Sequence, residues 1–293
     1  MAVDAGLDAG LRGMVLPRVQ ELSPTLRLAA DYVLKNPDVV AMHSLRKVAE
    51  ITDLNPPTFT RLARSLGLQN YEALRELCRQ EIQQNSGSFA DKAASLQRRQ
   101  SSAKGAFLPA HAAASIVNIE NLVETTDPGS LAQAADLLAK ARNVVLVGSL
   151  SSAALIDYLS YMARMAFPHW RSVLRNHETP EMGLSELGPH DAMIVLAHKP
   201  YASHAVEAAE RVRRAGVPVV AVTDSYAAPI AVDAAHVFVT PTNSPHFFAS
   251  AVPLVVLFEA LLSMVVRRGG RKTRERIAAI ERENHRSGAY WQG

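Results

Sequence analysis

Apolar residues in the first third of the chain recur every three or four positions, which is the spacing of one buried helix face. Ser23-Pro24 marks a helix start, because serine caps a first turn and proline fits the first helical position. Asn36-Pro37 ends this helix, Ser44 begins a second, and Gly67 closes a third. The pattern predicts a small α-helical domain over residues 14–90.

A short turn separates the second of these helices from the third. Asp53 stands where a tight turn needs a left-handed residue, and aspartate tolerates that conformation better than most residues. Asn55 and Pro56 then begin the third helix, in which Phe59 and Leu62 face the core. Two helices joined by a turn of about three residues are typical of a helix-turn-helix motif.

The outward side of the third helix carries no carboxylate, which suits contact with phosphate. Arginine can pair with guanine through two hydrogen bonds, threonine can contact a thymine methyl group, and an α-helix fits the major groove. The alternative is an ordinary solvated helix face. The expected contacts with double-stranded DNA come from this helix and the start of the helix before it: Ser44, Lys47, Thr58, Thr60, Arg61, Arg64 and Ser65.

The pattern changes in the second half of the chain, where short β-branched runs alternate with longer helical ones. Residues 91–115 predict a partly helical linker, and residues 269–293 a basic C-terminal helix. Strands that are apolar throughout and separated by helices indicate a parallel sheet buried on both faces. We therefore expect an α/β domain at 116–268, with three αβα layers and a five-stranded parallel sheet. Its strands are predicted at 144–147, 170–174, 192–197, 217–223 and 236–239, and its clearest helices at 152–166, 203–215 and 249–266.

Composition narrows the possible compartments and cofactors. Cys78 is the only cysteine, so the chain can form no internal disulfide and no Cys-rich metal site, and a reducing cytoplasmic location is favoured. Residues 1–13 lack the pattern of a secretory signal. The most apolar run, residues 251–266, is shorter than the roughly 20 residues that span a membrane. We expect no membrane partner, no metal and no cofactor.

Two loops of the predicted sheet domain carry candidate ligand-binding groups. In an open parallel sheet, ligands bind beyond the carboxyl ends of the strands, where the first amides of the following helix are unpaired. One loop is Gly148-Ser149-Leu150-Ser151-Ser152, which lacks the later glycines of a dinucleotide fingerprint. The other is residues 198–203, where Ser203 is the expected helix cap. The alternative is that these serines only cap helices. The residues expected to bind a small anionic metabolite are Ser149, Ser151, Ser152, His198, Lys199, Tyr201 and Ser203.

Residues 14–85 resemble the N-terminal domain of RpiR/MurR-type transcriptional regulators. The similar segments are 22–34, Asn36-Pro37, Ser44-Leu45, Val48-Ala49, 57–62 and Leu66-Gly67. The resemblance implies that this domain binds operator DNA and precedes a sugar isomerase (SIS) domain. It also implies a homodimer or homotetramer on a palindromic site.

The chain departs from the family pattern at three places. Asp53 replaces a more usual glycine in the turn, and Leu150 replaces the second glycine of the first ligand loop. The second loop holds Lys199-Pro200 where the family has small hydroxyl and glycine residues. The departures leave the fold prediction intact, and two of the three lie in the ligand loops.

The sequence thus predicts a DNA-binding regulator whose operator affinity is controlled by a small anionic, sugar-phosphate-like metabolite. SIS folds also occur in isomerases, so a sugar-phosphate isomerase is the alternative. His177-Glu178 and His190-Asp191 are the candidate acid and base pairs for that alternative, but neither pair lies in the two ligand loops. A third possibility is an adaptor that dimerises without binding DNA.

Overall fold

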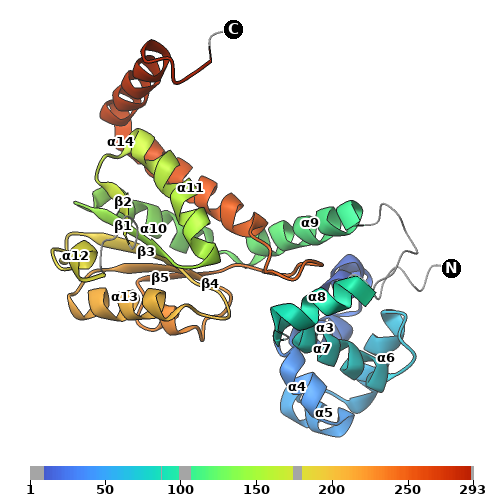
Figure 1. Ribbon diagram of the computed structural model, residues 1–293. Coiled ribbons are helices and arrows are strands. Elements are labelled where there is room, and N and C mark those ends of the chain that lie inside the picture. Colours follow the sequence, from blue (N-terminus) through green and yellow to red (C-terminus); the bar gives the residue numbers. More distant parts are fainter. Residues whose placement is uncertain (1–9, 87, 99–106, 174–179, 292–293) are drawn as a thin grey trace. The chain divides into compact units, whose positions relative to one another are not determined.

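The computed structural model describes residues 10–86, 88–98, 107–173 and 180–291. The chain forms two compact units (Figure 1). The N-terminal unit is Met1–Val117 together with Asn243–Ala249, and the sheet unit is Asn118–Thr242 together with Ser250–Gly293. We describe each unit by itself.

The N-terminal unit is helical. Ser23 and Ser44 accept hydrogen bonds from the amides of Leu26 and Lys47, so both serines cap helices as their sequence context predicts. Asp53 adopts the left-handed conformation with φ 55° and joins α5 to α6. The elements in chain order are α2 (Gly10–Val15), η1 (Leu16–Glu21), α3 (Pro24–Lys35), α4 (Pro37–Met42), α5 (Leu45–Thr52), α6 (Pro56–Ser65), α7 (Tyr71–Ser86), α8 (Phe89–Arg98) and α9 (Phe107–Thr125).

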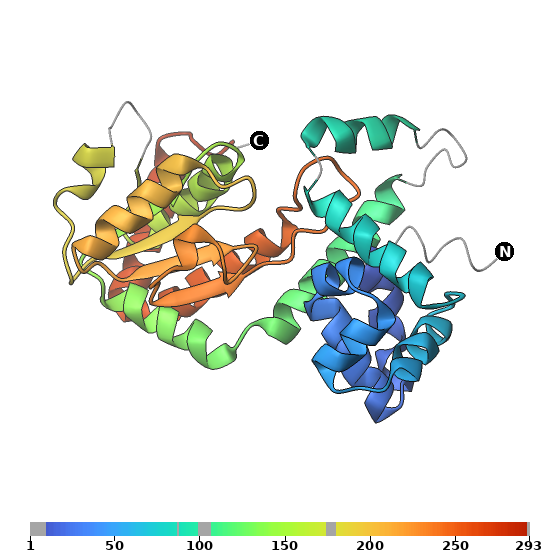
Figure 2. The same ribbon diagram turned by 90° about the horizontal axis from the view of Figure 1, so that it is seen from below.

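The sheet unit contains a five-stranded parallel sheet in the order β2-β1-β3-β4-β5. One face packs against α10, α11 and α14, and the other against α13 and the loops around it (Figures 1 and 2). Every residue of β1, β3 and β4 is buried, which confirms the predicted three-layer αβα fold. The elements are α10 (Pro128–Lys140), β1 (Val144–Gly148), α11 (Ser151–Ala166), β2 (Trp170–Ser172), α12 (Pro180–Leu184), β3 (Ala192–Leu196), α13 (Ser203–Arg214), β4 (Val219–Thr223), η2 (Pro229–Ala231), β5 (His236–Val239) and α14 (Val252–Arg286).

Most of the longer helices agree with the sequence prediction, and one is missing from it. Helices α8 and α9 lie in the segment for which the sequence predicts a partly helical linker. Helix α10 is absent from the prediction, although Asp127-Pro128 is a standard helix start and the Asp127 carboxylate accepts a hydrogen bond from the Ser130 amide. Helix α14 is broken at Gly270 (φ 63°), close to the point where the prediction passes from the apolar helix to the basic C-terminal helix. Among the described helices, none is both long and apolar enough to cross a bilayer.

Asp191 joins the amino ends of β1 and β3. Its side chain is fully buried and accepts hydrogen bonds from Arg142 through Nε (3.0 Å) and Nη2 (2.6 Å). Asn143 donates from its backbone amide (3.1 Å) and its Nδ2 (2.9 Å), and the Gly188 amide donates at 2.9 Å. The Arg142 guanidinium holds the pKa of this carboxyl well below its usual range. Asp191 therefore has a structural role at the edge of the sheet opposite the two ligand loops.

Candidate functional site

Helix α6 presents two cations to solvent. Phe59, Leu62 and Ala63 are fully buried, which fixes the rotation of the helix. Arg61 and Arg64 lie on the exposed side, and no carboxylate of the described chain forms an ion pair with either of them. The helix is thus held in the core by one side while two guanidinium groups remain available on the other.

The other polar residues of α6 are less available than the arginines. Thr60 is half-buried, and Ser65 is exposed but donates its hydroxyl to the Leu62 carbonyl (2.8 Å). Ser65 therefore satisfies its hydrogen-bond donor within the helix and has no proton left for a phosphate oxygen. The arginines are the principal candidates for contact with DNA.

The structure corrects the prediction for Thr58, which the sequence argument places on the exposed side of this helix. Its relative exposure is 1%. The reason is geometric: Thr58 precedes Leu62 by four residues and adjoins Phe59, so it lies within the buried stripe of α6. Thr58 cannot contact DNA in this conformation.

Helix α5 contributes less charge than its sequence suggests. Ser44 uses its side chain to cap the helix, and Lys47 is exposed but forms an ion pair with Glu50 (3.1 Å). Because Glu50 is itself exposed, the pair is weak and screened by salt. Lys47 therefore remains a candidate phosphate contact, with a nearby carboxylate that the sequence argument does not include.

The first ligand loop connects β1 to α11 at the carboxyl edge of the sheet. A Cβ atom at Gly148 would lie 2.6 Å from the Ile156 side chain and 3.1 Å from the Ser152 carbonyl oxygen, so only glycine lets the strand approach the helix this closely. Ser149 and Ser152 are half-buried, and Ser151 is exposed. No side chain caps α11, but the amides of Ser152 and Ala153 already donate to the Ser149 and Leu150 carbonyls (both 3.1 Å). Ser151, the first helical residue, is therefore the group at this helix start that faces solvent.

Leu150 has a backbone conformation that glycine adopts more readily than any other residue. Its φ is 55° and its ψ is −127°, and its side chain is 79% exposed, so packing does not compensate for the strain. The chain therefore keeps the geometry of the family's second glycine with a leucine in its place. We expect Leu150→Gly to raise the free energy of unfolding by about 1 kcal/mol in urea titrations, because the strain is removed. An equal or lower stability would show that leucine is not strained here.

The second ligand loop connects β3 to α13 and is bonded to the ends of β4 and β5. His198 Nε2 lies 2.8 Å from Thr240 Oγ1, and the Tyr201 hydroxyl donates to Asp224 Oδ1 (2.9 Å). Burial lowers the pKa of His198, opposed by the charge of Asp224, which favours the neutral imidazole. Burial and the bond to Asp224 raise the pKa of Tyr201. This loop is therefore a hydrogen-bonded polar cluster whose only exposed cation is Lys199 among the described residues 198–203.

Ser203 does not have its predicted role. The cap of α13 is Ala202, without a side-chain hydrogen bond, and Ser203 is the first helical residue. The sequence prediction places the helix start one residue too late. Ser203 is exposed and its hydroxyl remains near the start of the helix.

Sequence reasoning misses three polar residues of this cluster. Thr223 donates its hydroxyl to Asp224 (3.3 Å), and Thr240 donates to the Thr223 carbonyl (3.3 Å). Thr223 ends β4, Asp224 follows it and Thr240 follows β5, whereas His198 and Tyr201 follow β3. The sequence signal that could have identified them is their position at the ends of predicted parallel strands, because the carboxyl ends of such strands meet at one edge of the sheet.

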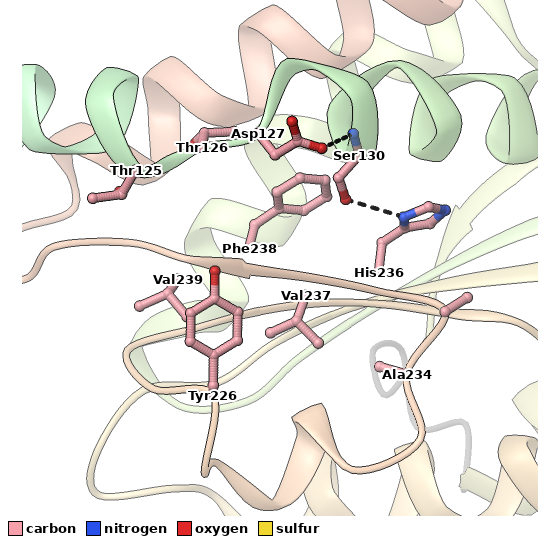
Figure 3. Close-up of a pocket in the computed structure, with 11 residues that line it drawn as sticks. Thr125, Thr126, Asp127, Ser130, Tyr226, Ala234, His236, Val237, Phe238 and Val239 are labelled. Atoms are coloured by element: carbon pink, nitrogen blue, oxygen red, sulfur yellow. Dashed lines mark hydrogen bonds between the residues drawn. The ribbon is translucent and has the colours of Figure 1, made fainter.

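A cavity of about 330 Å³ lies elsewhere, along β5 (Figure 3). Ser130 Oγ lies 3.3 Å from His236 Nδ1 on its wall, and burial lowers the pKa of His236. The cavity contains none of the predicted ligand residues. Its described lining is Thr125, Thr126, Asp127, Ser130, Tyr226 and residues 234–239.

Metal chemistry finds no support in the described residues. No group of three or more histidine, cysteine or acidic side chains among them could hold a metal ion.

The acid and base pairs of the isomerase alternative are His177-Glu178 and His190-Asp191. The first pair lies outside the described residues, and Asp191 of the second accepts five hydrogen bonds.

Comparison with known proteins identifies the sheet unit. The family model described as "SIS domain" matches residues 137–264. No curated protein sequence matches the chain significantly. One similar solved structure is the sugar isomerase domain of an RpiR transcription factor from Sphaerobacter thermophilus, with 28% identity and a TM-score of 0.53, covering 59% of this chain and 94% of that one.

A second similar structure extends over both units. The Vibrio vulnificus NanR protein complexed with ManNAc-6P has 19% identity and a TM-score of 0.55, and the match covers 96% of this chain and 100% of NanR. At this identity the similarity concerns the fold. The resemblance to RpiR-type regulators is confirmed by the SIS domain and these two structures, and the helical N-terminal region is consistent with a helix-turn-helix. Residues 137–264 therefore match the SIS domain family, and the sheet unit has the SIS fold.

Proposed function

We propose that this chain is a transcriptional regulator that binds operator DNA through α6 and binds a small anionic metabolite through its SIS domain. The observation that carries the proposal is the pair Arg61 and Arg64, exposed on a helix whose other side is locked in the core. That helix shares a chain with an SIS domain 28% identical to that of an RpiR transcription factor. In this proposal residues 14–90 form the DNA-binding domain, and the protein acts as a homodimer or homotetramer.

Selection from random DNA duplexes tests the DNA-binding proposal and identifies the operator in the same experiment. Full-length protein should enrich a palindromic sequence whose half-sites are separated by one or more helical turns. Affinity for the enriched site should fall steeply as the salt concentration rises, because bound phosphates release counterions. Enrichment of no sequence, together with salt-independent retention, would favour the adaptor alternative.

The proposed effector is a sugar-phosphate-like anion held at the carboxyl edge of the sheet. Ser151 offers an exposed hydroxyl at the N-terminus of α11, and Lys199 offers an exposed charge. The NanR structure was determined with ManNAc-6P, which makes this compound the first probe to use. Binding of the effector changes operator affinity only by as much as its affinities for the two states of the protein differ.

Lys199→Ala is expected to weaken the binding of ManNAc-6P about tenfold. The lysine supplies a charge-assisted contact to the phosphate, and its exposure keeps the effect at the lower end of the usual range. Calorimetry with ManNAc-6P and with unphosphorylated ManNAc measures the difference, and Lys272→Ala on α14 is the matched control. An equal loss for both ligands, or no loss, would remove Lys199 from the phosphate site, and no binding of ManNAc-6P would exclude it as the effector.

Catalysis is not part of the proposal. One compared structure is named as part of a transcription factor, although the domain itself is called a sugar isomerase domain. In the candidate ligand loops, His198 and Tyr201 are already hydrogen-bonded to Thr240 and Asp224. An isomerase would need an acid or base that is free to reach its substrate. Turnover of a sugar phosphate by the purified protein would reverse this conclusion.

A further inference from the structure

Seven residues of the C-terminal half belong to the N-terminal unit. Asn243–Ala249 cluster with that unit, whereas their neighbours Thr242 and Ser250 belong to the sheet unit. The Ser250 amide donates to the Thr242 carbonyl (3.1 Å), so the two ends of the segment are held together. We name residues 243–249 the tether loop.

The tether loop has an ordered internal structure. The His246 amide donates to Ser244 Oγ (3.0 Å), and the Phe248 amide donates to His246 Nδ1 (3.1 Å). The Phe247 ring lies 4.3 Å from the His246 ring and 4.9 Å from the Phe248 ring, between centroids. The loop therefore presents a defined aromatic surface.

This surface packs on the helices that connect the DNA-binding region to the SIS domain. Phe248 stacks on Phe89 of α8, with centroids 4.4 Å apart and planes 18° apart. His246 lies 6.0 Å from His111 of α9. Phe89 and Phe248 are 40% and 36% exposed, so the contact buries only part of each ring. A contact of this size stabilises α8 and can still break and re-form.

The chain segment that leads from β5 into the tether loop begins in the candidate ligand site. Thr240 is buried, its amide donates to the Thr223 carbonyl (2.8 Å), and its hydroxyl lies 2.8 Å from His198 Nε2. His198 directly precedes Lys199 in the second ligand loop. Only Pro241 and Thr242 separate Thr240 from the tether loop.

We propose that the tether loop couples the second ligand loop to helices α8 and α9. A change in the His198 loop shifts Thr240, the shift passes through two residues of backbone to the tether loop, and the Phe248–Phe89 stack tightens or loosens α8. The regulatory meaning of this coupling rests on the proposed function, but the coupling itself is a property of the free protein. It requires neither DNA nor an effector for its test.

Hydrogen–deuterium exchange of the full chain, read on peptides from α8, tests the coupling. Thr240→Val removes the hydroxyl beside His198 at nearly constant volume, and we expect it to raise the exchange of α8 amides about fivefold. Phe248→Ala is expected to raise it at least as much. In the double variant, Thr240→Val should add nothing, because the tether is already broken.

Two results would overturn the proposal. One is unchanged α8 exchange in Thr240→Val, and the other is a full additional effect of Thr240→Val in the Phe248→Ala background. His198→Asn repeats the test from the loop side, should Thr240→Val fail to fold. Tyr161→Ala, which removes an exposed ring on α11, is the control for general destabilisation. Failure to bind DNA would refute the proposed function and leave this exchange result standing.

Discussion

Asp191→Ala is expected to lower the free energy of unfolding of the SIS domain by about 3–5 kcal/mol. The substitution removes a fully buried carboxylate that accepts from Arg142, Asn143 and Gly188 at the start of β1 and β3. The donors from Asn143 and Gly188 then lose their buried acceptor, which is costly, whereas the Arg142 side chain is 62% exposed and can bind water. Urea unfolding followed by circular dichroism measures the change.

The control for this prediction is another carboxylate–arginine pair. Asp136 bonds Arg268 on the surface between α10 and α14, where the aspartate side chain is 52% exposed. Asp136→Ala should cost about 1 kcal/mol, because its carboxylate is half-exposed and Arg268 keeps its bonds to the Met264 and Ala132 carbonyls. If both variants lose the same stability, the buried network at Asp191 has no special role.

The pH dependence of stability tests whether the negative charge of Asp191 is the cause of its stabilising effect. The bond from Arg142 lowers the pKa of the folded carboxyl below its ordinary value of 3.8, so the folded state binds the proton less readily than the unfolded state. The stabilisation is therefore complete above about pH 4 and is lost as the pH falls toward the folded pKa. The stability difference between the wild type and Asp191→Asn should shrink on acidification below about pH 4. A constant difference would mean that shape, not charge, is responsible.

The sheet is predictable from sequence because buried parallel strands need continuous apolar runs. The runs at 144–147, 192–197 and 236–239 agree with β1, β3 and β5 to within about one residue. Nothing in such a run states which strand lies beside which. The contact of His198 with Thr240 therefore becomes visible only when the strand order is known.

The wrong predictions for Thr58 and Ser203 come from single-residue details of helix geometry. The sequence argument assigns Thr58 to the exposed side of α6 because it is not one of the apolar residues of the core-facing stripe, although its spacing to Leu62 places it inward. It assigns Ser203 to the cap because serine favours that position, whereas the chain enters α13 at Ala202. A one-residue shift changes a helix boundary little and changes the role of a side chain completely.

Asp53 and Leu150 show how far a departure from the family pattern is tolerated. Both residues stand where the family prefers glycine, and both keep a positive φ of 55°. Aspartate at ψ 28° lies in the left-handed helical region, which it tolerates, whereas leucine at ψ −127° lies in a region that glycine alone favours. The fold is therefore preserved at both sites, and strain is concentrated at the ligand loop.

The double variant Arg61→Ala/Arg64→Ala is expected to bind the selected operator about two orders of magnitude more weakly than the wild type. An arginine that pairs with a base contributes about 1–3 kcal/mol of discrimination, and one that contacts phosphate contributes to binding of any sequence. Because both side chains are exposed and form no ion pair within the described chain, the protein's own stability should change little. Fluorescence anisotropy with labelled operator measures the loss.

The single variants separate the two kinds of contact. If Arg61 reads a base, Arg61→Ala should weaken operator binding by about 1–3 kcal/mol and leave random DNA nearly unaffected. If Arg64 contacts phosphate, Arg64→Ala should weaken binding to the operator and to random DNA alike. It should also reduce the slope of log affinity against log salt concentration by about one. Arg214→Ala on α13 removes the same charge from an exposed side chain of the SIS domain and controls for net charge. Unchanged operator affinity in the double variant would mean that α6 does not bind DNA. The proposed function would then no longer be supported by the exposed pair Arg61 and Arg64.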